Sequence, residues 1–297
     1  MYDVIIIGGG PAGMTAALYS LRESFKVLVI EKESFGGQIS KSPILENYPS
    51  ISKISGLEFS DNLLDQITNL GAEFDVDEVV DIKQQNDIFI VKTVYSEYKA
   101  KYVIIATGVT HKKLEALNYQ KFEGNGLSYC ATCDGPLFKD KNVVVIGDAN
   151  SALQYALLLS KYANSVMICT LFDHFFADPI LINRIKETSN ISYKHNLSLL
   201  EYKGELNLSS LSFKDTLTNE IVEINCDGCF VAIGQEPHNE IFKNLVDLEN
   251  GFIVVNDDME TKTPNLFAVG DCRNKKVRQV VTAISDAAIA SVTISKK

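Results

Sequence analysis

The sequence has no long apolar segment, no basic leader and no run of lysines and arginines, and each absence excludes a class of protein. Its 297 residues contain no apolar stretch of about 18 residues or more, so no transmembrane helix is expected. The N-terminal residues are apolar, but no basic segment precedes them, and we expect no signal peptide. With 28 lysines and arginines against 38 aspartates and glutamates, the net charge of −10 disfavours nucleic acid and anionic membranes as partners. These absences indicate a cytoplasmic globular protein.

Cysteine is also scarce. The six cysteines are too few for a disulfide scaffold, so their positions carry the information. No low-complexity linker interrupts the chain, and at roughly 150 residues per domain its length suggests two domains.

A short internal sequence similarity indicates that the two domains are related. Residues 4–13 read VIIIGGGPAG and residues 143–152 read VVVIGDANSA. Each begins with a β-branched run typical of a buried parallel strand, passes through a turn and opens a helical pattern. The alternation predicts an α/β fold of two Rossmann-like, three-layer domains, the second inserted into the first. We place the first domain at residues 1–113 and 240–297, and the second at residues 114–239.

Apolar runs elsewhere extend this prediction. The expected strands lie at residues 27–30, 102–106, 166–169, 230–233 and 266–269, and the expected helices at residues 12–21 and 151–162.

The first turn carries a Gly-x-Gly-x-x-Gly motif between a strand and a helix, and Glu31 ends the next strand. Gly8 permits the tight turn, Gly10 lets a pyrophosphate approach the backbone, and Gly13 lets the helix pack closely on the strand. The helix N-terminus offers N–H donors to phosphate, and Glu31 can accept hydrogen bonds from a ribose. This combination predicts a dinucleotide site rather than a merely structural turn. Its residues are Gly8, Gly10, Pro11, Ala12, Gly13, Glu31 and Lys32.

A Cys-Ala-Thr-Cys-Asp sequence at residues 130–134 is the strongest chemical signal. A Cys-x-x-Cys turn brings two sulfurs within bonding distance and lowers the pKa of one thiol, so Cys130 and Cys133 can cycle between dithiol and disulfide. Asp134 can move the proton that this exchange requires. The alternatives are half of a zinc site and a buried pair of small residues.

Cys226 and Cys229 form a second Cys-x-x-Cys, so a four-cysteine zinc site has to be considered. The two pairs are more than roughly 90 residues apart, which is far beyond the spacing of zinc ribbons. We interpret Cys226 and Cys229 as structural residues that lead into a strand, with an auxiliary redox or metal role as the alternative. Cys169 and Cys272 are interpreted as buried small residues.

Short motifs along essentially the whole chain occur in the order found in one family. They are Gly-Gly-Gln at 36–38, Glu-Asn-Tyr-Pro at 46–49, Ala-Thr-Gly at 106–108, Cys-Ala-Thr-Cys-Asp-Gly at 130–135, Gly-Asp at 270–271 and Arg-Gln-Val at 278–280. In this order they resemble the low-molecular-weight bacterial flavin thioredoxin reductases. Beyond the glycine turn, the resemblance implies that FAD is bound by Gly37, Gln38, Asn47, Thr107, Gly108, Gly270, Asp271, Arg278, Gln279 and Val280. Taken alone, Asp271 could equally be a loop or helix-capping carboxylate.

The resemblance also implies roles for the dithiol and its partners. Cys133 would face the flavin, and Cys130 would attack the disulfide of thioredoxin. The family is a homodimer whose flexibly joined domains bind FAD in one and carry NADPH and the dithiol in the other.

At the second glycine turn the sequence departs from the family, which has three glycines there. This chain has Gly147, Asp148 and Ala149. Asp148 puts a carboxylate where pyrophosphate would bind, and Ala149 puts a methyl group where the backbone must approach it. After the next strand, residues 170–176 (TLFDHFF) lack the arginines with which the family holds the NADPH 2′-phosphate. We therefore expect neither NADPH nor NADH to bind.

Electrons must then enter by another route. In lacking the nucleotide signature the chain resembles the ferredoxin-dependent flavin thioredoxin reductases, which implies reduced ferredoxin as the donor. Two alternatives stay open. One is an NAD(P)H-dependent thioredoxin reductase with a divergent site, and the other is a flavin-bound redox sensor that uses its dithiol without turnover.

The ferredoxin hypothesis also requires a surface on which the donor protein can bind. Ferredoxins are usually acidic, so an acidic chain needs a local basic patch to bind one. The candidates are Lys112-Lys113 and Lys275-Lys276-Arg278. The alternative is that these are ordinary solvated loop residues.

Overall fold

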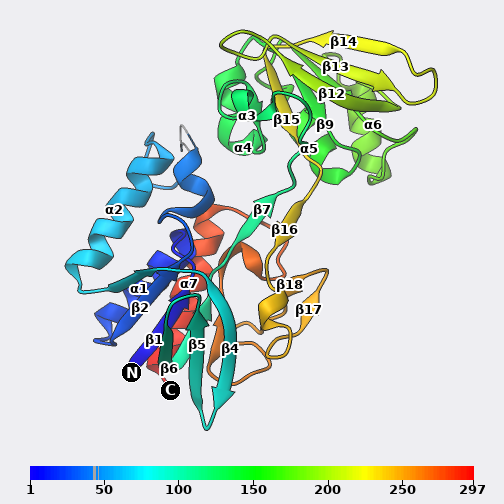
Figure 1. Ribbon diagram of the computed structural model, residues 1–297. Helices are drawn as coiled ribbons and strands as arrows, with labels where there is room; N and C mark the ends of the chain where they lie inside the picture. The colour runs from blue at the N-terminus through cyan, green and yellow to red at the C-terminus, as the bar shows by residue number, and fades with distance from the viewer. Residues whose placement is uncertain (43–44, 46) are drawn as a thin grey trace. The chain divides into compact units, whose positions relative to one another are not determined.

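The computed structural model describes residues 1–42, 45 and 47–297, and the chain divides into two compact units (Figure 1). Unit 1 is formed by Met1–Thr110 and Glu236–Lys297, and unit 2 by His111–Gln235. The chain passes between them through β7 (Val109–His111) and β16 (Gln235–Pro237), which pair with each other. The boundaries predicted from the sequence, after residues 113 and 239, lie a few residues farther along the chain.

Unit 1 is built on a seven-stranded sheet in the order β3-β2-β1-β6-β5-β4, with β19 also pairing β6. The neighbours of β1 are parallel to it, whereas β4 and β5 form an antiparallel hairpin. The long β6 joins the two parts, because its first residues pair with β5 and its last residues with β19. The strands are β1 (Tyr2–Ile7), β2 (Val27–Glu31), β3 (Glu73–Val76), β4 (Val79–Gln85), β5 (Ile88–Thr93), β6 (Glu97–Ile105) and β19 (Leu266–Ala268).

Alternate side chains of β1 enter two different cores, as the period of a strand requires. Val4 and Ile6 pack with helices α1 (Pro11–Arg22) and α7 (Val280–Ser295), whereas Ile5 and Ile7 pack with Phe89, Val91 and Phe242. Small residues let α1 and α7 approach closely, and the Ser291 hydroxyl donates to the carbonyl oxygen of Ala16 at 3.1 Å. The remaining elements of unit 1 are η1 (Gly37–Lys41), α2 (Gly56–Asn69), η3 (Glu240–Phe242), β17 (Leu248–Glu249), β18 (Phe252–Ile253) and η4 (Gly270–Cys272).

Unit 2 contains a parallel five-stranded sheet in the order β11-β10-β9-β15-β8 and an antiparallel sheet in the order β12-β13-β14. The parallel strands are β8 (Leu127–Ser128), β9 (Asn142–Ile146), β10 (Ser165–Cys169), β11 (Ile191–Lys194) and β15 (Gly228–Val231). The antiparallel strands are β12 (Leu197–Lys203), β13 (Ser210–Asp215) and β14 (Ile221–Asn225). The helices are α3 (Tyr119–Phe122), α4 (Ala131–Asp134), η2 (Gly135–Phe138), α5 (Asn150–Leu159) and α6 (Pro179–Glu187).

The predicted α/β fold is confirmed. The apolar runs expected to be strands overlap β2, β6, β10, β15 and β19, although the runs in β6, β15 and β19 extend one or two residues beyond the strand, and the expected helices are α1 and α5. Helix α5 ends at Leu159, before the predicted end at residue 162, because residues 160–162 form turns. Among the described residues, no helix is long and apolar enough to cross a membrane.

Candidate functional site

The first glycine turn of unit 1 uses its three motif glycines for two different purposes. Gly8 has φ of +113°, and a Cβ there would lie 2.3 Å from the carbonyl oxygen of Ala106. A Cβ at Gly13 would lie 1.9 Å from the carbonyl oxygen of Gly8, so α1 packs on this turn with no room for a side chain. A Cβ at Gly10 would meet nothing closer than the Cα of Gly37, at 3.9 Å. Gly8 and Gly13 therefore serve the fold, whereas Gly10 leaves open space at the start of α1.

The carboxylate of Glu31 lies at the end of β2 and holds the same turn. Its Oε2 accepts the backbone N–H of Gly9 at 2.6 Å, and its Oε1 accepts that of Glu33 at 3.1 Å. Each carboxylate oxygen has a second lone pair, so Glu31 can also accept a ribose hydroxyl. Lys32 is half exposed and pairs with Glu33 at 3.9 Å, so it takes no part in the turn itself.

The loops that the resemblance assigns to FAD come together around this turn. A Cβ at Gly37 would lie 3.2 Å from the Cα of Gly10, and Gln38 Nε2 donates to the carbonyl oxygen of Val109 at 3.2 Å. Asn47 Nδ2 donates to Gln279 Oε1 at 3.1 Å. Gln279 caps α7, which begins at Val280, and Pro11 is the first residue of α1. Glu46 of the Glu-Asn-Tyr-Pro motif lies outside the described residues.

Asn239 is a buried side chain that the sequence interpretation missed. Its Nδ2 donates to the carbonyl oxygens of Gly251 and Cys272, and its Oδ1 accepts the hydroxyl of Thr107 at 3.3 Å. It therefore ties the Ala-Thr-Gly segment to the Gly-Asp-Cys segment. Gly108, the residue after Thr107, has φ of +65°, and a Cβ at this position would have no neighbouring atom within 4 Å.

Asp271 carries a buried oxygen that has no hydrogen-bond partner in the described part of the chain. It lies in η4, where its neighbour Gly270 packs against Ala12 of α1: a Cβ at Gly270 would lie 2.9 Å from that of Ala12. Within the described residues, Oδ1 of Asp271 accepts no hydrogen bond, and the ammonium of Lys275 is 3.7 Å away. Burial raises the pKa of Asp271, and Lys275 and Arg278 oppose that rise. A buried acceptor of this kind calls for a donor that the described residues do not supply.

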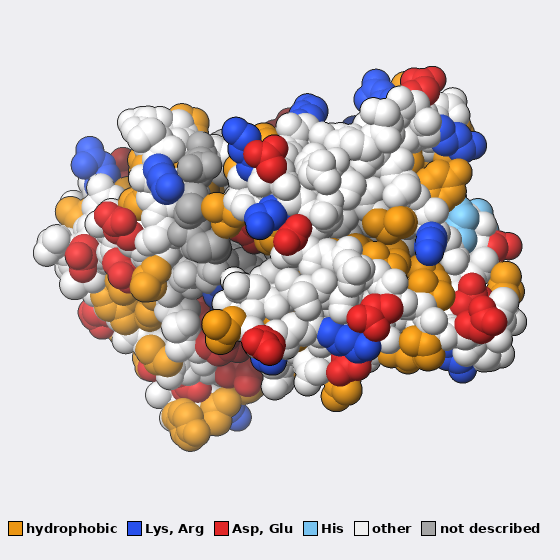
Figure 2. All heavy atoms as spheres, turned by 90° about the horizontal axis from the view of Figure 1, so that it is seen from above, with side chains coloured by type: hydrophobic (Ala, Val, Ile, Leu, Met, Phe, Trp, Pro, Cys, Tyr) orange, Lys and Arg blue, Asp and Glu red, His pale blue; other side chains and the backbone are white. Residues whose placement is uncertain are grey.

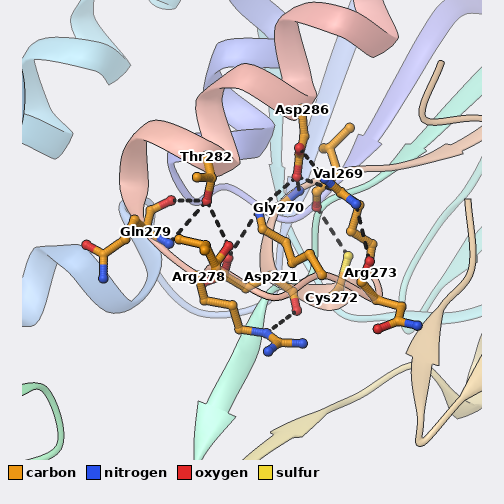
Figure 3. Close-up of polar contacts among 12 residues, drawn as sticks. Val269, Gly270, Asp271, Cys272, Arg273, Arg278, Gln279, Thr282 and Asp286 are labelled. Atoms are coloured by element: carbon orange, nitrogen blue, oxygen red, sulfur yellow. Dashed lines mark hydrogen bonds and ion pairs between the residues drawn. The ribbon is translucent and has the colours of Figure 1, made fainter. Parts of the chain in front are cut away.

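Asp286 organises the segment around Asp271 (Figure 3). It is 4% exposed, and it is the only charged residue in α7. Its Oδ2 accepts the N–H of Gly270 at 3.1 Å, Nε of Arg273 at 2.8 Å and Nζ of Lys275 at 2.9 Å, and its Oδ1 accepts the guanidinium of Arg273 at 2.6 Å. Burial by itself raises the pKa of Asp286, but these hydrogen bonds lower it by more. A lone carboxylate in an otherwise uncharged helix was the signal that could have identified it from the sequence.

The contact between Lys275 and Asp286 contradicts one part of the predicted basic docking patch. The side chain of Lys275 is 5% exposed and bonded to Asp286, so the expectation that it steers a partner protein is wrong. Lys113 pairs with Glu123 at 2.8 Å, and Arg278 lies 4.1 Å over the ring of Phe252. On the face shown in Figure 2, lysines and arginines are interspersed with aspartates and glutamates, with no wide area of positive charge.

The Cys-x-x-Cys of unit 2 forms a disulfide at the start of α4. Cys130 and Cys133 are bonded, with their Cα atoms 5.3 Å apart, and the N–H of Cys133 points at Sγ of Cys130 at 3.1 Å. An N–H donor in this position favours a thiolate on Cys130 once the bond is reduced. The carboxyl group of Asp134 is buried, which raises its pKa, and Oδ2 accepts the hydroxyl of Ser128 at 2.6 Å. The turn that carries the disulfide thus also carries a buried carboxyl group, on the residue that follows Cys133.

The other four cysteines are buried thiols. Burial raises the pKa of Cys169 and Cys226 to about 12 and that of Cys272 to about 11, and it raises that of Cys229 well above the ordinary value. Thiols of this kind are poor nucleophiles and metal ligands at neutral pH. Among the described residues, no three histidines, cysteines or acidic residues are placed to hold a metal ion. These observations favour the structural interpretation of Cys226 and Cys229.

The second glycine turn is closed by a loop of its own unit. The carbonyl oxygen of Asp148 accepts the N–H of Phe176 at 2.8 Å, and its Oδ1 accepts the N–H of Phe172 at 3.4 Å. Two positions further, Asn150 exchanges hydrogen bonds with Asp178: its Oδ1 accepts the backbone N–H of Asp178 at 2.7 Å, and its Nδ2 donates to the carboxylate of Asp178 at 3.1 Å. Burial raises the pKa of Asp148. The start of α5, where a dinucleotide would bind, is therefore lined by the segment between Phe172 and Asp178.

Comparison with known proteins agrees with this geometry. Residues 2–287 match the family model described as "Pyridine nucleotide-disulphide oxidoreductase". The chain belongs to that family, and FAD is the cofactor expected for it.

Within the family, the chain is a homologue of thioredoxin reductases. It is 40% identical to a thioredoxin reductase of Bacillus subtilis (strain 168), over 99% of this chain and 94% of that protein. It is 35% identical to a "34.2 kDa protein in rubredoxin operon" of Clostridium pasteurianum, over 99% of this chain and 96% of that protein. The crystal structure of thioredoxin reductase from Streptococcus pyogenes has a TM-score of 0.94 and 34% identity, and covers 100% of this chain and 97% of that one.

The residues of unit 1 fit FAD. The open space at Gly10 suits a pyrophosphate, and the carboxylates of Glu31 and Asp271 can accept hydroxyl donors from a ribose and a polyol chain. The buried Oδ1 of Asp271, which accepts no hydrogen bond within the described residues, is the observation that carries this assignment.

Replacing Gly10 by alanine should separate cofactor binding from folding. The new methyl group meets no protein atom within 3.9 Å, so the free energy of unfolding of the apoprotein should change by less than about 1 kcal/mol. The same methyl occupies the space beside the backbone, so FAD affinity should fall at least about tenfold. Gly13→Ala is the matched control, because its Cβ clashes with Gly8 and should destabilise the fold by about 1–3 kcal/mol. Chemical denaturation and FAD titration measure both quantities, and wild-type FAD affinity in Gly10→Ala would contradict the assignment.

Replacing Asp286 by asparagine should destabilise unit 1. The variant leaves Arg273 without its carboxylate partner and Lys275 with only the more distant Asp271, and the free energy of unfolding should fall by about 3–5 kcal/mol at neutral pH. Because the folded pKa of Asp286 is lowered, its contribution is present above the unfolded pKa of about 4 and is lost as the pH falls through the folded pKa. Asp247→Asn, which breaks an exposed pair with Lys262, should cost less than about 1 kcal/mol. Equal losses in the two variants on urea denaturation would refute the importance of the buried network.

Proposed function

We propose that this chain is a ferredoxin-dependent thioredoxin reductase, which uses FAD and the Cys130–Cys133 dithiol to reduce the disulfide of thioredoxin. The family and the homologues support the disulfide reductase chemistry. The closure of the second glycine turn by its own loop supports a donor other than NADPH. FAD, when bound, accepts electrons singly and passes them on as a pair.

Charge and space both oppose a pyridine nucleotide in unit 2. Asp148 would face a pyrophosphate, and two unit charges about 4 Å apart repel by about 4 kcal/mol near a protein surface. The backbone N–H groups of Phe172 and Phe176 already bond to Asp148, and the loop offers no arginine for a 2′-phosphate. A nucleotide would therefore have to displace the loop and then bind against like charge.

A homologue supports the choice of a one-electron donor. The Clostridium pasteurianum relative is named as a protein of a rubredoxin operon, whereas most of the other relatives are named thioredoxin reductases. A small iron protein is a one-electron carrier, as ferredoxin is.

The dithiol reaction follows from the two sulfurs and their neighbours. Cys130 as thiolate attacks the disulfide of thioredoxin, so one substrate S–S bond breaks and a mixed disulfide forms. Cys133 then attacks Sγ of Cys130, which releases the second substrate sulfur and restores the enzyme disulfide. The N–H of Cys133 stabilises charge on Cys130, and Asp134 supplies protons to the departing thiolates.

We further propose a cytoplasmic homodimer that associates through unit 1. Helix α7 has no charge apart from the buried Asp286, and its exposed residues Val281, Ile289 and Val292 lie on one side of the helix. A second copy of the chain would cover this uncharged face. A dithiol cycle fed by ferredoxin also needs a reducing compartment.

A comparison of donors tests the proposed source of electrons. Under anaerobic conditions, reduced ferredoxin should bleach the flavin absorbance and support the release of thioredoxin thiols, whereas NADPH and NADH should do neither at millimolar concentration. Dithionite is the control, because it reduces any accessible flavin. Bleaching near one equivalent of NADPH or NADH would refute the ferredoxin proposal in favour of a divergent nucleotide site. Absence of thioredoxin reduction with every donor, dithionite included, would favour the redox sensor.

Replacing Cys130 by serine should abolish thioredoxin reduction while FAD stays bound, because the attacking sulfur is lost and unit 1 is unchanged. Turnover should fall by at least about 10³-fold, as expected when a covalent nucleophile is removed. Cys226→Ala, in the second Cys-x-x-Cys, is the matched control and should retain turnover, since that thiol is buried and unbonded. Steady-state assays with thioredoxin check both, and retained turnover in Cys130→Ser would contradict its role.

A further inference from the structure

Ser128 connects the backbone of Cys130 to the carboxyl group of Asp134. It ends β8 and is 5% exposed. Its Oγ accepts the N–H of Cys130 at 3.1 Å and donates to Oδ2 of Asp134 at 2.6 Å. The carbonyl oxygen of Cys130 is 3.5 Å from the same Oγ, too far to compete for the hydroxyl proton. The hydroxyl group of Ser128 thus donates to Asp134 and accepts from Cys130, and both of these residues lie in the turn that carries the disulfide.

The two oxygens of Asp134 consequently have different surroundings. Oδ2 is held by Ser128, whereas Oδ1 is buried and has no hydrogen-bond partner in the described part of the chain. The hydroxyl of Tyr155, which also lies within electrostatic range of Asp134, donates instead to the carbonyl oxygen of Tyr129 at 3.2 Å. Since Oδ2 accepts the proton of Ser128, the proton of a neutral Asp134 resides on Oδ1.

We propose that Ser128 is a positioning residue for disulfide exchange, which holds Oδ2 of Asp134 and leaves Oδ1 as the atom that exchanges protons with the sulfurs. This inference rests on the proposed function, because it describes the proton path of the same dithiol. It concerns only residues of unit 2 and is independent of the electron donor.

Protons and electrons balance along this path. Oδ1 takes the proton of the Cys130 thiol, the thiolate attacks the substrate disulfide, and the departing substrate thiolate takes that proton from Oδ1. Oδ1 then takes the proton of the Cys133 thiol, Cys133 attacks Sγ of Cys130, and the second substrate thiolate leaves with the proton. Two protons and one electron pair pass from the enzyme dithiol to the substrate, and Asp134 ends as it began. Whenever Oδ1 is deprotonated, the hydroxyl of Ser128 stabilises the carboxylate through Oδ2.

The pH dependence of thiol reactivity tests this role. The full-length holoprotein is reduced with dithiothreitol and desalted, and the rate at which iodoacetamide alkylates Cys130 is followed from acidic to basic pH by mass spectrometry. Ser128→Ala should move the inflection due to Asp134 upward by about one to two pH units, because a hydrogen bond to the carboxylate is lost. Turnover with thioredoxin should fall through kcat, with KM unchanged. Ser128→Thr, which keeps the hydroxyl, should restore the wild-type profile.

Three further variants make the result decisive. Ser210 of β13 is as buried as Ser128, and its hydroxyl donates to the carboxylate of Glu223 in β14 at 2.9 Å. Ser210→Ala should leave the pH profile unchanged. In an Asp134→Asn background, Ser128→Ala should cause no additional shift, because its effect acts through that carboxylate. If Ser128→Ala does not fold, Ser128→Val and Ser128→Thr have the same shape and differ in the hydroxyl alone.

The outcomes separate this inference from the proposed function. An unchanged profile in folded Ser128→Ala or Ser128→Val, or a shift of the same size in the Asp134→Asn background, would overturn the role of Ser128. Failure of ferredoxin to reduce the protein would refute the proposed donor instead, since the alkylation profile requires neither ferredoxin nor thioredoxin.

Discussion

One buried carboxylate holds together the part of unit 1 that fits the far end of a dinucleotide. Asp286 projects from α7 and binds the backbone of Gly270 and the cations of Arg273 and Lys275. Removing a carboxylate from water is costly, and here that cost is offset by four donor contacts and two opposite charges. Because these contacts fix η4 against α7, Asp271 is held with one oxygen that accepts no hydrogen bond from the described residues. Its binding capacity depends on a neighbour that need not touch the cofactor.

The two glycine turns share one backbone plan and reach opposite outcomes. In unit 1 the carboxylate of Glu31 bonds to Gly9 and leaves the start of α1 open at Gly10. In unit 2 the carboxylate is in the turn itself, at Asp148: its Oδ1 accepts the N–H of Phe172, and the backbone carbonyl oxygen of Asp148 accepts the N–H of Phe176. In unit 1 the carboxylate thus lies on the neighbouring strand and the start of the helix is open, whereas in unit 2 the turn itself is bonded to the following loop.

Burial assigns different chemistry to cysteines with the same spacing. Cys130 and Cys133 lie in a half-buried turn with an N–H donor and a carboxyl group beside them. Cys226 and Cys229 have the same spacing, but they enter a strand in the apolar core, which favours their protonated form. The sulfur atoms are identical, and the surrounding dielectric and donors decide which pair can form a thiolate.

The sequence by itself determined the features that depend on consecutive residues: the α/β fold, the glycine turn of unit 1 and the bonded Cys130–Cys133 pair. In each of these, neighbours in the chain form both the local element and its chemistry, so the motif together with its flanking residues identifies them. Spacing alone does not, because Cys226 and Cys229 have the same spacing as the bonded pair. Only the tertiary structure decided the partners of Asp286, the burial of Lys275 and the position of Asn239. These contacts join separate segments, with Thr107 and Asn239 132 positions apart. No local pattern encodes them, because whether a charged or polar side chain is solvated or buried depends on what folds over it.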